Sequence, residues 1–431
     1  MNSFRSTQLI SQFKHQPPTK LTALASIPAI DPDDMPKLAV PITLDEGSEA
    51  RRQKLSNVIN ELKIHDLDII SDLKHRLVGI IDRCLDAFAS DDNDLGFCNI
   101  VEHAINTADA HPVREKLSLV HFHRRPFVDK EIERYLFRVI ICKADPGKCP
   151  WASAIVVVNK KENDLAKLLD ALRMCHDYRK VNALTIKDAY PLPLINDILV
   201  GLGKAKYFVS LDLLMGYHQI PVKESDRPKT AFITHRGLFM FKRMPFGLCN
   251  APATFHRLMD ALFEGKIGQE ILVFLDDILI FAETPEQLLD ALERTLQTLA
   301  RAGLKCKHRK CQLFRTFVEY LGHIISDKGI APDPKKIEKI RDWPAPETGN
   351  GLLSFLGFCN YYRRLIPHFA ELSAPLYAVA QQKKIDMNAI LLDAFVKLKD
   401  AMCATVSLRI PDPKSPFILE TDASNVALAL F

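Results

Sequence analysis

Apolar residues recur every three or four positions in several stretches of the chain, the spacing that puts them on one face of a helix. The strongest such pattern runs from 285 to 303. Thr284 supplies an N-cap, Pro285 the first turn, Gln287 a capping-box partner and Gly303 a stop. The same spacing predicts one or two helices within 51–90 and further helices at 127–141, 194–203, 251–265 and 352–369, with Asp129 placed to cap the helix at 127–141 and Asn250 the helix at 251–265.

Runs of β-branched and aromatic residues predict strands at 153–161 and 207–213 and a hairpin across 271–281. Asp276 and Asp277 form the tip of that hairpin, between two strongly apolar halves. Two adjacent carboxylates repel each other and are costly to bury, so the tip must face water, a basic partner or bound cations.

Asp212 ends the strand at 207–213, after a similar apolar run. The order strand, helix, hairpin, helix, strand predicts a sheet with helices on one face, which can present Asp212 beside the hairpin tip. Three carboxylates gathered there are the ligand set that two Mg²⁺ ions need, because hard divalent cations prefer carboxylate and phosphate oxygens. A pair of such ions can bind both the attacking and the leaving oxygen of a phosphoryl transfer. Bound metal would therefore explain why the carboxylates are tolerated.

The composition is ordinary for a globular chain of 431 residues, with 47% hydrophobic and 26% charged residues, and the length allows two to four domains. No apolar stretch approaches the roughly 20 residues that cross a bilayer, and no secretory signal is visible. Ten scattered cysteines indicate reduced thiols rather than a disulfide framework. We therefore expect an intracellular protein, cytoplasmic or nuclear, that is not secreted and has no membrane partner.

Positive charge is concentrated in one segment, although the net charge is only +4. Residues 301–343 hold 11 Lys and Arg against 5 Asp and Glu, a net +6, so the rest of the chain carries −2. Such a run is the footprint expected of a contact with a phosphate backbone, but a basic run is more often a solvated face. The sequence leaves both interpretations open.

The acidic hairpin, ILVFLDDILIF, resembles the catalytic hairpin of reverse transcriptases, in the version with a bulky residue before the two acids. Other stretches resemble, in the same order, the polymerase of gypsy-type LTR retrotransposon Pol polyproteins: PWASAIVVVNKK, DYRKVNALTIKDAYPLP, AKYFVSLDLLMGYHQIPV, KTAFIT, FKRMPFGLCNAPATFHRLMD, VEYLGHIIS and FLGFCNYYRRLIP. The resemblance covers about 111–431. It implies an RNA-directed DNA polymerase with an α+β right-hand fold, made of fingers, a palm with a ferredoxin-like sheet, and a partial thumb or connection.

This resemblance also suggests a division of the chain into domains. The expected parts are a flexible leader at 1–50, a helical N-terminal segment at 51–110, fingers and palm at 111–330 with a core at about 140–326, a thumb or connection at 331–385, and a truncated RNase H-like start at 386–431.

The resemblance assigns the metal site and the sugar selectivity to particular residues. Asp212, Asp276 and Asp277 would hold two Mg²⁺ ions, which Mn²⁺ could replace, and the carbonyl of Leu213 would help. Tyr217 matches the steric gate, an aromatic ring that occupies the space of a ribose 2′-hydroxyl and so selects dNTPs. A packed core aromatic is the alternative interpretation of Tyr217.

Further roles concern the incoming nucleotide. Lys160 and Arg173 match the fingertip residues that clamp its triphosphate. Phe246 matches the residue beneath the nucleotide, and Leu275 the residue that touches the primer end. Lys310 is a candidate for protonating the leaving pyrophosphate, or else a lysine that contacts the nucleic-acid backbone.

Two assignments concern the primer and the C-terminal end. Leu321 and Gly322 match the primer grip, in which a close backbone approach holds the primer 3′ end in line. The stretch FILETDASN resembles the first strand of an RNase H domain, and Asp422 matches its first metal ligand. The other carboxylates of that site do not follow, so no RNase H activity is expected from this chain.

The resemblance implies a polymerase that extends a primer 3′-hydroxyl by two-metal catalysis. Its partners would be an RNA template, a DNA or RNA primer, dNTPs, and the protease, RNase H and integrase segments of a longer Pol polyprotein. One departure from the family pattern is the stretch at 162–172, which enlarges the fingertip hairpin between Lys160 and Arg173. It favours the alternative of a decayed or domesticated fragment that binds nucleic acid without polymerising.

Overall fold

The computed structural model describes residues 48–117, 120–159, 172–191, 202, 205–274, 277–404, 421–423 and 428–430, all within one compact unit, Pro36–Phe431. The expected leader at 1–50 lies almost entirely outside these residues, as do most of the helix predicted at 194–203 and the stretch at 160–171. Within the described residues, no helix is long and apolar enough to cross a membrane.

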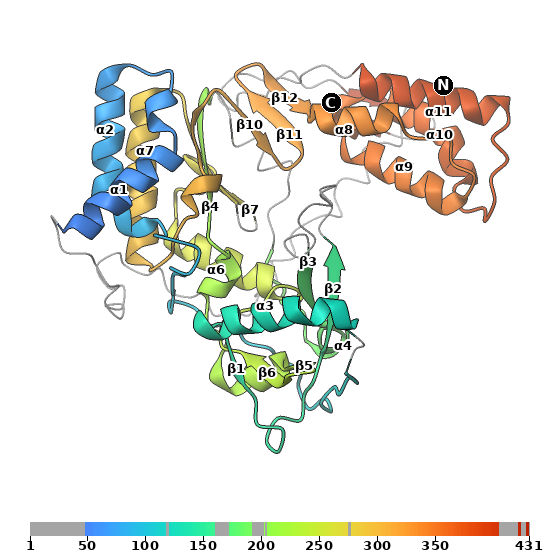
Figure 1. The fold of residues 1–431 in the computed structure, drawn as a ribbon. Coiled ribbons are helices and arrows are strands. Elements are labelled where there is room, and N and C mark those ends of the chain that lie inside the picture. The colour runs from blue at the N-terminus through green and yellow to red at the C-terminus, as the bar shows by residue number, and fades with distance from the viewer. Residues whose placement is uncertain are drawn as a thin grey trace, which may run out of the picture. The chain divides into compact units, whose positions relative to one another are not determined.

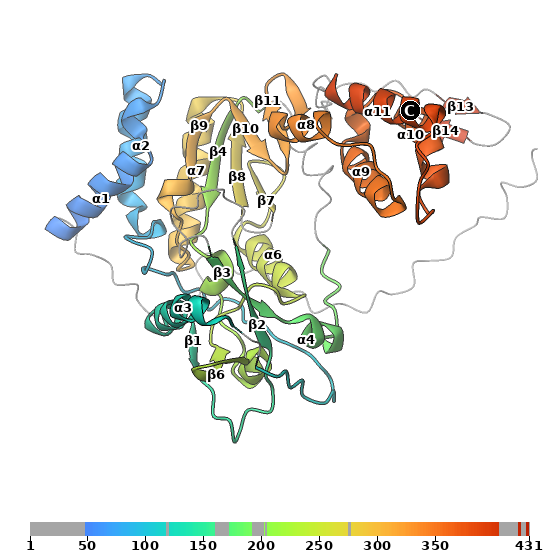
Figure 2. The ribbon, with the colours of Figure 1, turned by 45° about the vertical axis from the view of Figure 1, so that its right-hand side comes forward.

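A four-stranded antiparallel sheet positions the acidic residues. Its strands are β4 (Tyr207–Asp212), β7 (Ile271–Phe274), β8 (Asp277–Ala282) and β9 (Gln312–Arg315), in the order β7-β8-β4-β9 (Figure 2). Helix α6 (Ala251–Leu262) connects β4 to β7, and helix α7 (Pro285–Arg301) connects β8 to β9. This strand order with these two crossovers is the ferredoxin-like arrangement, which confirms the predicted palm.

One face of this sheet packs against a second sheet. Successive side chains of a strand point to opposite faces. Phe208, Leu279 and Phe281 therefore share one face, and they pack with Val318 and Tyr320 of a second, three-stranded sheet. That sheet is formed by β10 (Phe317–Tyr320), β11 (His323–Ser326) and β12 (Gly329–Pro332). By the same alternation, Asp212 and Asp277 lie on the face that carries Phe208.

Helix α7 begins and ends as its sequence predicts. The Thr284 side chain accepts a hydrogen bond from the Gln287 backbone at 3.3 Å, and Gly303 follows the helix at a φ of 71°. The leucine stripe is buried. Helices α1 (Glu49–Glu61) and α2 (Ser71–Arg83) confirm the prediction of one or two helices within 51–90. Helix α2 packs on α7 (Figure 1), and an ion pair joins Arg83 of α2 to Glu293 of α7 at 2.8 Å.

Residues 88–110 contain no helix, so the helical part of the expected segment 51–110 ends at Ala87, within the range 51–90 predicted for its helices. A 3₁₀ helix, η1 (Ile64–Asp66), lies between α1 and α2, and a second one, η2 (Leu85–Ala87), is the last helical turn. The chain then runs in an extended form past the ends of β4 and α7, where it makes the contacts described below.

The predicted fingers consist of a hairpin, a small sheet and flanking helices. Strands β2 (Ala154–Asn159) and β3 (Leu172–Asp177) pair antiparallel, with Val158 opposite Arg173. The small sheet has the order β1-β6-β5 and consists of β1 (Ile141–Lys143), β5 (Phe232–Thr234) and β6 (Gly237–Phe241). The helices of this part of the chain are η3 (Phe122–Arg124), α3 (Arg125–Phe137), α4 (Arg179–Leu184), η5 (Gly216–Gln219) and η6 (Glu224–Thr230).

Two predicted helix caps are wrong in detail. Helix α3 begins at Arg125, four residues before Asp129, whose carboxylate instead bonds to the His235 ring at 2.9 Å. Asn250 does occupy the N-cap position of α6, but its side chain accepts from the Asp188 backbone and donates to the Ile186 carbonyl, so it does not cap the helix. In both cases a partner distant in sequence takes the polar group.

The segment after β12 is helical and shares one core. It comprises α8 (Pro334–Arg341), α9 (Gly349–Tyr361), η8 (Arg363–Leu365), α10 (Phe369–Val379) and α11 (Ala389–Cys403). The single helix predicted at 352–369 is thus divided, because α9 ends at Tyr361 and η8 follows it. A helix cannot continue through 366–368, since Ile366 precedes a proline and His368 has a φ of 54°. Phe355, Leu376 and Leu398 belong to the same cluster, so a boundary at 385 would cut through this core. Two further strands, β13 (Thr421–Ala423) and β14 (Leu428–Leu430), pair antiparallel.

Candidate active site

The end of β4 and the start of β8 bring two of the three predicted metal ligands together. Asp212 and Asp277 are direct partners in the antiparallel register of these strands. Directly opposed residues of such a pair have Cβ atoms about 4.5–5.5 Å apart. Leu275 and Asp276 lie outside the described residues, so the third ligand is not placed. Among the residues that are described, no group of three His, Cys, Asp or Glu side chains is close enough to hold a metal ion.

One cation stands beside this acidic pair. Lys310 Nζ lies 3.0 Å from Oδ2 and 3.3 Å from Oδ1 of Asp212. It belongs to η7 (His308–Lys310), which is fixed to β4 by a hydrogen bond from Lys307 N to Asp212 O at 2.8 Å. The predicted candidate Lys310 is therefore at the acidic pair.

The protein environment disfavours the charged form of Asp277. Desolvation of its carboxylate is the largest cause that raises its pKa, and the negative charge of Asp212 raises it further, while Lys310 acts in the opposite direction. Asp277 is nevertheless exposed as a residue, so the site is open to solvent and to ions. Two crowded like charges on an open surface with oxygen donors fit a divalent cation.

Tyr217 and Phe246, predicted from separate motifs, form one stacked pair. Their ring centroids are 4.8 Å apart with 25° between the planes, and Phe255 contacts Tyr217 from another side at 5.6 Å. Tyr217 is only 7% exposed, whereas Phe246 is 44% exposed. Tyr217 lies in η5, five residues after Asp212, and the left-handed backbone of Met215 (φ 50°) makes the turn between them. Tyr217 is thus packed, as a core aromatic would be, and also close to Asp212 along the chain, as a steric gate would be. Its position does not decide between these two roles.

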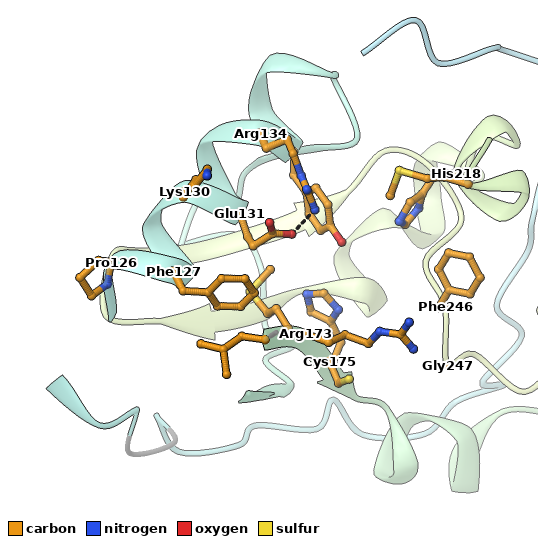
Figure 3. A pocket seen from close by; sticks show the side chains of 15 residues that line it. Pro126, Phe127, Lys130, Glu131, Arg134, Arg173, Cys175, His218, Phe246 and Gly247 are labelled. Atoms are coloured by element: carbon orange, nitrogen blue, oxygen red, sulfur yellow. Dashed lines mark hydrogen bonds and ion pairs between the residues drawn. The ribbon is translucent and has the colours of Figure 1, made fainter. Parts of the chain in front are cut away.

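A cavity of about 710 Å³ lies between α3, β3 and the loop that carries Phe246. Figure 3 shows the Arg173 side chain extending along this cavity toward Phe246, and an ion pair between Glu131 and Arg134 on the α3 side. Arg173 is exposed, as a residue that contacts a phosphate must be. Its predicted partner Lys160 lies outside the described residues, so the structure gives the position of Arg173 alone and the predicted clamp stays a prediction.

Two histidines on the wall of this cavity were missed by the sequence reasoning. Burial lowers the pKa of His176 to about 3 and that of His218 to about 4, so both are neutral. His218 also bonds through Nδ1 to the Met244 carbonyl at 3.0 Å. Only the position of His218 directly after Tyr217 could have pointed to it. His176 had no signal in the sequence.

The predicted primer grip is a tight turn between β10 and β11. Leu321 and Gly322 have φ values of 52° and 73°. Two hydroxyls from the end of α9 hold this turn: Tyr361 donates to the Leu321 carbonyl at 2.5 Å, and Tyr362 to the Gly322 carbonyl at 2.8 Å. Both tyrosines belong to the motif FLGFCNYYRRLIP, which by itself predicts no role for them.

Tyr320, just before the turn, is a further residue without a predicted role. It is 3% exposed, and its hydroxyl has no hydrogen-bond partner among the described residues. Burial, followed by the charge of Asp277, raises its pKa.

The basic run at 301–343 is less positive at its surface than the sequence suggests. Lys307 pairs with Asp92 at 2.8 Å and Arg309 with Glu61 at 3.1 Å, while Lys305 pairs with Asp94. These acids all come from the N-terminal segment. Lys305, Lys307 and Arg309 are therefore already partnered by acids, which weakens the interpretation of this part of the run as a phosphate-binding surface.

The ferredoxin-like palm, with two opposed carboxylates at its strand ends, fits the class of nucleic-acid polymerases. Residues 158–325 match the family described as "Reverse transcriptase (RNA-dependent DNA polymerase)". The chain thus contains a reverse transcriptase domain, and its relatives are LTR retrotransposon Pol polyproteins.

Three relatives come from Drosophila melanogaster. The chain is 35% identical over 355 residues to the retrovirus-related Pol polyprotein from transposon 297, 38% over 340 residues to that from transposon opus, and 35% over 379 residues to that from transposon gypsy. These matches cover 82%, 76% and 85% of this chain. The chain spans about a third of the relatives' length, 33%, 33% and 36%.

Solved structures of the foamy viral protease-reverse transcriptase share this fold. One, in complex with double-stranded DNA, gives a TM-score of 0.75 at 25% identity and covers 89% of this chain and 65% of that one. Another, in complex with an RNA/DNA hybrid, gives 0.72 at 24% identity and covers 90% and 50%. The right-hand polymerase fold is therefore confirmed.

Proposed function

We propose that this chain is an RNA-directed DNA polymerase that extends a primer 3′-hydroxyl with dNTPs. The observation that carries the proposal is the register pairing of Asp212 with Asp277 at the strand ends of a ferredoxin-like palm, inside a reverse transcriptase domain. The chain's relatives are Pol polyproteins, and the foamy viral enzyme of similar fold binds an RNA/DNA hybrid and double-stranded DNA. We extend those partners to this chain as template and primer.

Reverse transcriptases generally use divalent cations, and we propose Mg²⁺ here, with Mn²⁺ as a substitute. Asp212, Asp276 and Asp277 would hold two ions, with the Leu213 carbonyl as a further ligand. When bound, the ions supply charge stabilisation for the attacking and leaving oxygens of phosphoryl transfer. The chain's contribution is to gather oxygen donors whose mutual repulsion only a cation relieves.

Other side chains would bind and orient the reactants. Arg173, with Lys160, would contact the triphosphate of the incoming nucleotide, because a guanidinium can donate two parallel hydrogen bonds to phosphate oxygens. Phe246 would lie against the nucleotide, and the Tyr217 ring behind it would exclude a 2′-hydroxyl. Lys310, whose Nζ lies 3.0 Å from Oδ2 of Asp212, would neutralise or protonate the leaving group.

The remaining residues would position the primer. Leu321 and Gly322 would approach the primer 3′ end with their backbone, and Leu275 would touch it. The RNase H match of Asp422 stays a prediction, because only its strand pairing, opposite Ala429, is described. The same proposal includes an intracellular site of action and further protease, RNase H and integrase segments on a longer polyprotein.

Primer extension on a homopolymeric RNA template with Mg²⁺ tests this function. We expect incorporation by the wild-type chain and a loss of at least about 100-fold in Asp277→Asn and Asp276→Asn, because each variant removes a charged metal ligand. Asp290→Asn, an acid on α7 that pairs with Arg76 of α2, is the matched control and should retain activity. Equal incorporation by all four proteins would contradict the assignment. No incorporation by the wild type would favour a decayed fragment that binds nucleic acid.

A further inference from the structure

Residues 87–98, which we call the upstream segment, are hydrogen-bonded to the backbone next to the acidic pair. Cys306 N donates to the Ala87 carbonyl at 2.7 Å, and Ala89 N donates back to the Cys306 carbonyl at 3.0 Å. Cys306 also forms an antiparallel bridge with Leu213. The backbone at Cys306 therefore connects the upstream segment to the residue that follows Asp212.

Gln219, the last residue of η5, is the second point of attachment. It is fully buried, and its side-chain amide donates to the carbonyls of Leu214 and Lys305 at 2.8 and 2.9 Å. The side-chain carbonyl oxygen of Gln219, Oε1, accepts a hydrogen bond from Lys305 N at 2.8 Å. Cys98 N donates to the Gln219 backbone carbonyl at 2.8 Å. Every polar group of this side chain is therefore used, and its bonds link Gln219 to Leu214, on the other side of Tyr217, and to the backbone of Lys305.

Gly96 leaves no room for a side chain at this junction. A Cβ atom on Gly96 would lie 2.2 Å from the Gln219 Oε1 and 2.4 Å from the Gly303 carbonyl oxygen. The Gly303 carbonyl already accepts from Phe97 N at 2.9 Å, so it cannot withdraw without losing that bond. Any larger residue at position 96 must displace either the segment or Gln219.

The upstream segment also holds the strand that leads to Phe246. The Arg243 guanidinium donates to the Gly96 carbonyl at 3.1 Å and lies over the Phe97 ring, 4.3 Å from its centroid. Arg243 directly precedes Met244, whose carbonyl accepts from His218. Both members of the stacked pair, Tyr217 and Phe246, are thus attached through neighbours to the same few upstream residues.

We propose that the upstream segment is a positioning element for nucleotide selection, acting through Gln219 and Arg243 on Tyr217 and Phe246. The inference rests on the proposed polymerase function, but it concerns residues outside the matched range 158–325. None of residues 87–98 touches the nucleotide in this scheme. They set where the gate ring stands.

The test compares Gly96→Ala with Gly79→Ala in the full chain. Gly79 is a helical glycine of α2 whose added Cβ would meet only the end of a flexible arginine, so it is a matched control. The main measurement is the ratio of kcat/KM for a dNTP to that for the corresponding rNTP. This ratio does not change when part of the protein is merely unfolded, because both substrates see the same active fraction.

We expect Gly96→Ala to lower this ratio by about tenfold, since small displacements of positioning groups have large effects on rate. Gly79→Ala should keep the wild-type ratio. Phe97→Leu, which removes the ring beneath Arg243 without adding volume, should lower the ratio by a smaller factor in the same direction, and it decides the question if Gly96→Ala does not fold. A wild-type ratio in the folded variants would overturn the inference.

Amide hydrogen exchange separates this inference from the proposed function, because it requires no polymerase activity. We expect faster exchange across 214–220 in Gly96→Ala than in Gly79→Ala, with α6 unchanged. Unchanged exchange at 214–220 would exclude the positioning role even in an active enzyme. Faster exchange in a chain that does not polymerise would support the structural link while the proposed activity fails.

Discussion

At the scale of single residues, the acidic pair imposes a cost on the metal-free fold. Asp212 and Asp277 face each other across two strands, and the pKa of Asp277 is raised by burial and by the charge of Asp212. Residues selected for cation binding often destabilise the protein without its ligand. The pair could be predicted from sequence because each acid directly follows or begins an apolar strand run.

Replacement of one acid should therefore stabilise the empty site and remove the effect of magnesium. We expect Asp277→Asn to raise the midpoint of thermal unfolding in metal-free buffer by a few degrees, since it removes a crowded like charge. Added Mg²⁺ should raise the midpoint of the wild-type chain by ligand binding but leave the variant unchanged. Differential scanning calorimetry with and without Mg²⁺ measures both effects. A magnesium response of equal size in both proteins would place the cation elsewhere.

Sugar selection belongs to the same scale. Tyr217→Ala should admit rNTPs, because it removes the ring that stacks on Phe246 and opens the space behind it. We expect the preference for dNTPs over rNTPs to fall by at least about tenfold. Tyr377→Ala, a half-exposed tyrosine on α10, is the control with the same chemical change. Unaltered selectivity in Tyr217→Ala would leave the residue with a packing role only.

At the scale of elements, the turn between β10 and β11 depends on a different part of the chain for its conformation. Both residues of the turn have positive φ values, and Leu321 is not a glycine, so the turn is strained on its own. The hydroxyls of Tyr361 and Tyr362 compensate by bonding the two turn carbonyls. The position of the turn is thus coupled to α9.

Two tyrosine-to-phenylalanine changes test this coupling against each other. Tyr362→Phe removes a hydrogen bond of 2.8 Å and should lower the free energy of unfolding by about 1 kcal/mol. Tyr320→Phe removes a buried hydroxyl that has no partner among the described residues, so it should be neutral or stabilising. Denaturant unfolding of the two variants gives the comparison. Equal losses in both would mean that the Tyr362 bond contributes nothing specific.

The elements show where sequence patterns suffice. Helix α7 has the predicted N-cap, buried stripe and stop, because all three act within one helix. Asp129 and Asn250 did not cap their helices, because His235 and the backbone around Asp188 offer them competing bonds. Local rules therefore fail where a polar side chain meets a partner from another element.

At the scale of the whole molecule, long-range pairing decides what the sequence could not. The basic run was visible along the chain, but its neutralisation by Glu61, Asp92 and Asp94 joins residues 211 to 248 positions apart. No periodicity reports such pairs. The motif residues of the site could be named from sequence, whereas the upstream segment and the two tyrosines that hold the turn could not.

Stability should depend on pH through histidines whose pKa is lowered by burial of the ring, most of all His103, His176 and His218. Burial lowers the pKa of His103 and His218 to about 4 and that of His176 to about 3. In the unfolded chain these rings take up protons near about pH 6.5. Because each pKa is lowered by folding, the stabilisation is fully present above about pH 6.5 and is lost as the pH falls toward about 4.

We expect the free energy of unfolding to fall by up to about 4 kcal/mol per pH unit in that window, since each proton contributes about 1.4 kcal/mol per unit. Urea unfolding at a series of pH values measures the slope. His103→Gln can keep a bond to Thr254, the partner of His103 at 2.8 Å, and should reduce the slope because it removes one of the groups that take up a proton on unfolding. A flat profile between about pH 6 and pH 5 would contradict the prediction.

The docking of α2 and the upstream segment on α7 and its flanking loop has a consequence for translation. Leu73, Leu77 and Ile80 of α2 are buried in the finished protein, yet α7 is synthesised some 200 residues later. The nascent chain must therefore carry an exposed apolar helix face until α7 has emerged, and such a face is a binding site for chaperones and a source of aggregation. Ribosome-bound chains that stop before α7 should bind chaperones, and chains long enough for α7 to have left the ribosome should release them.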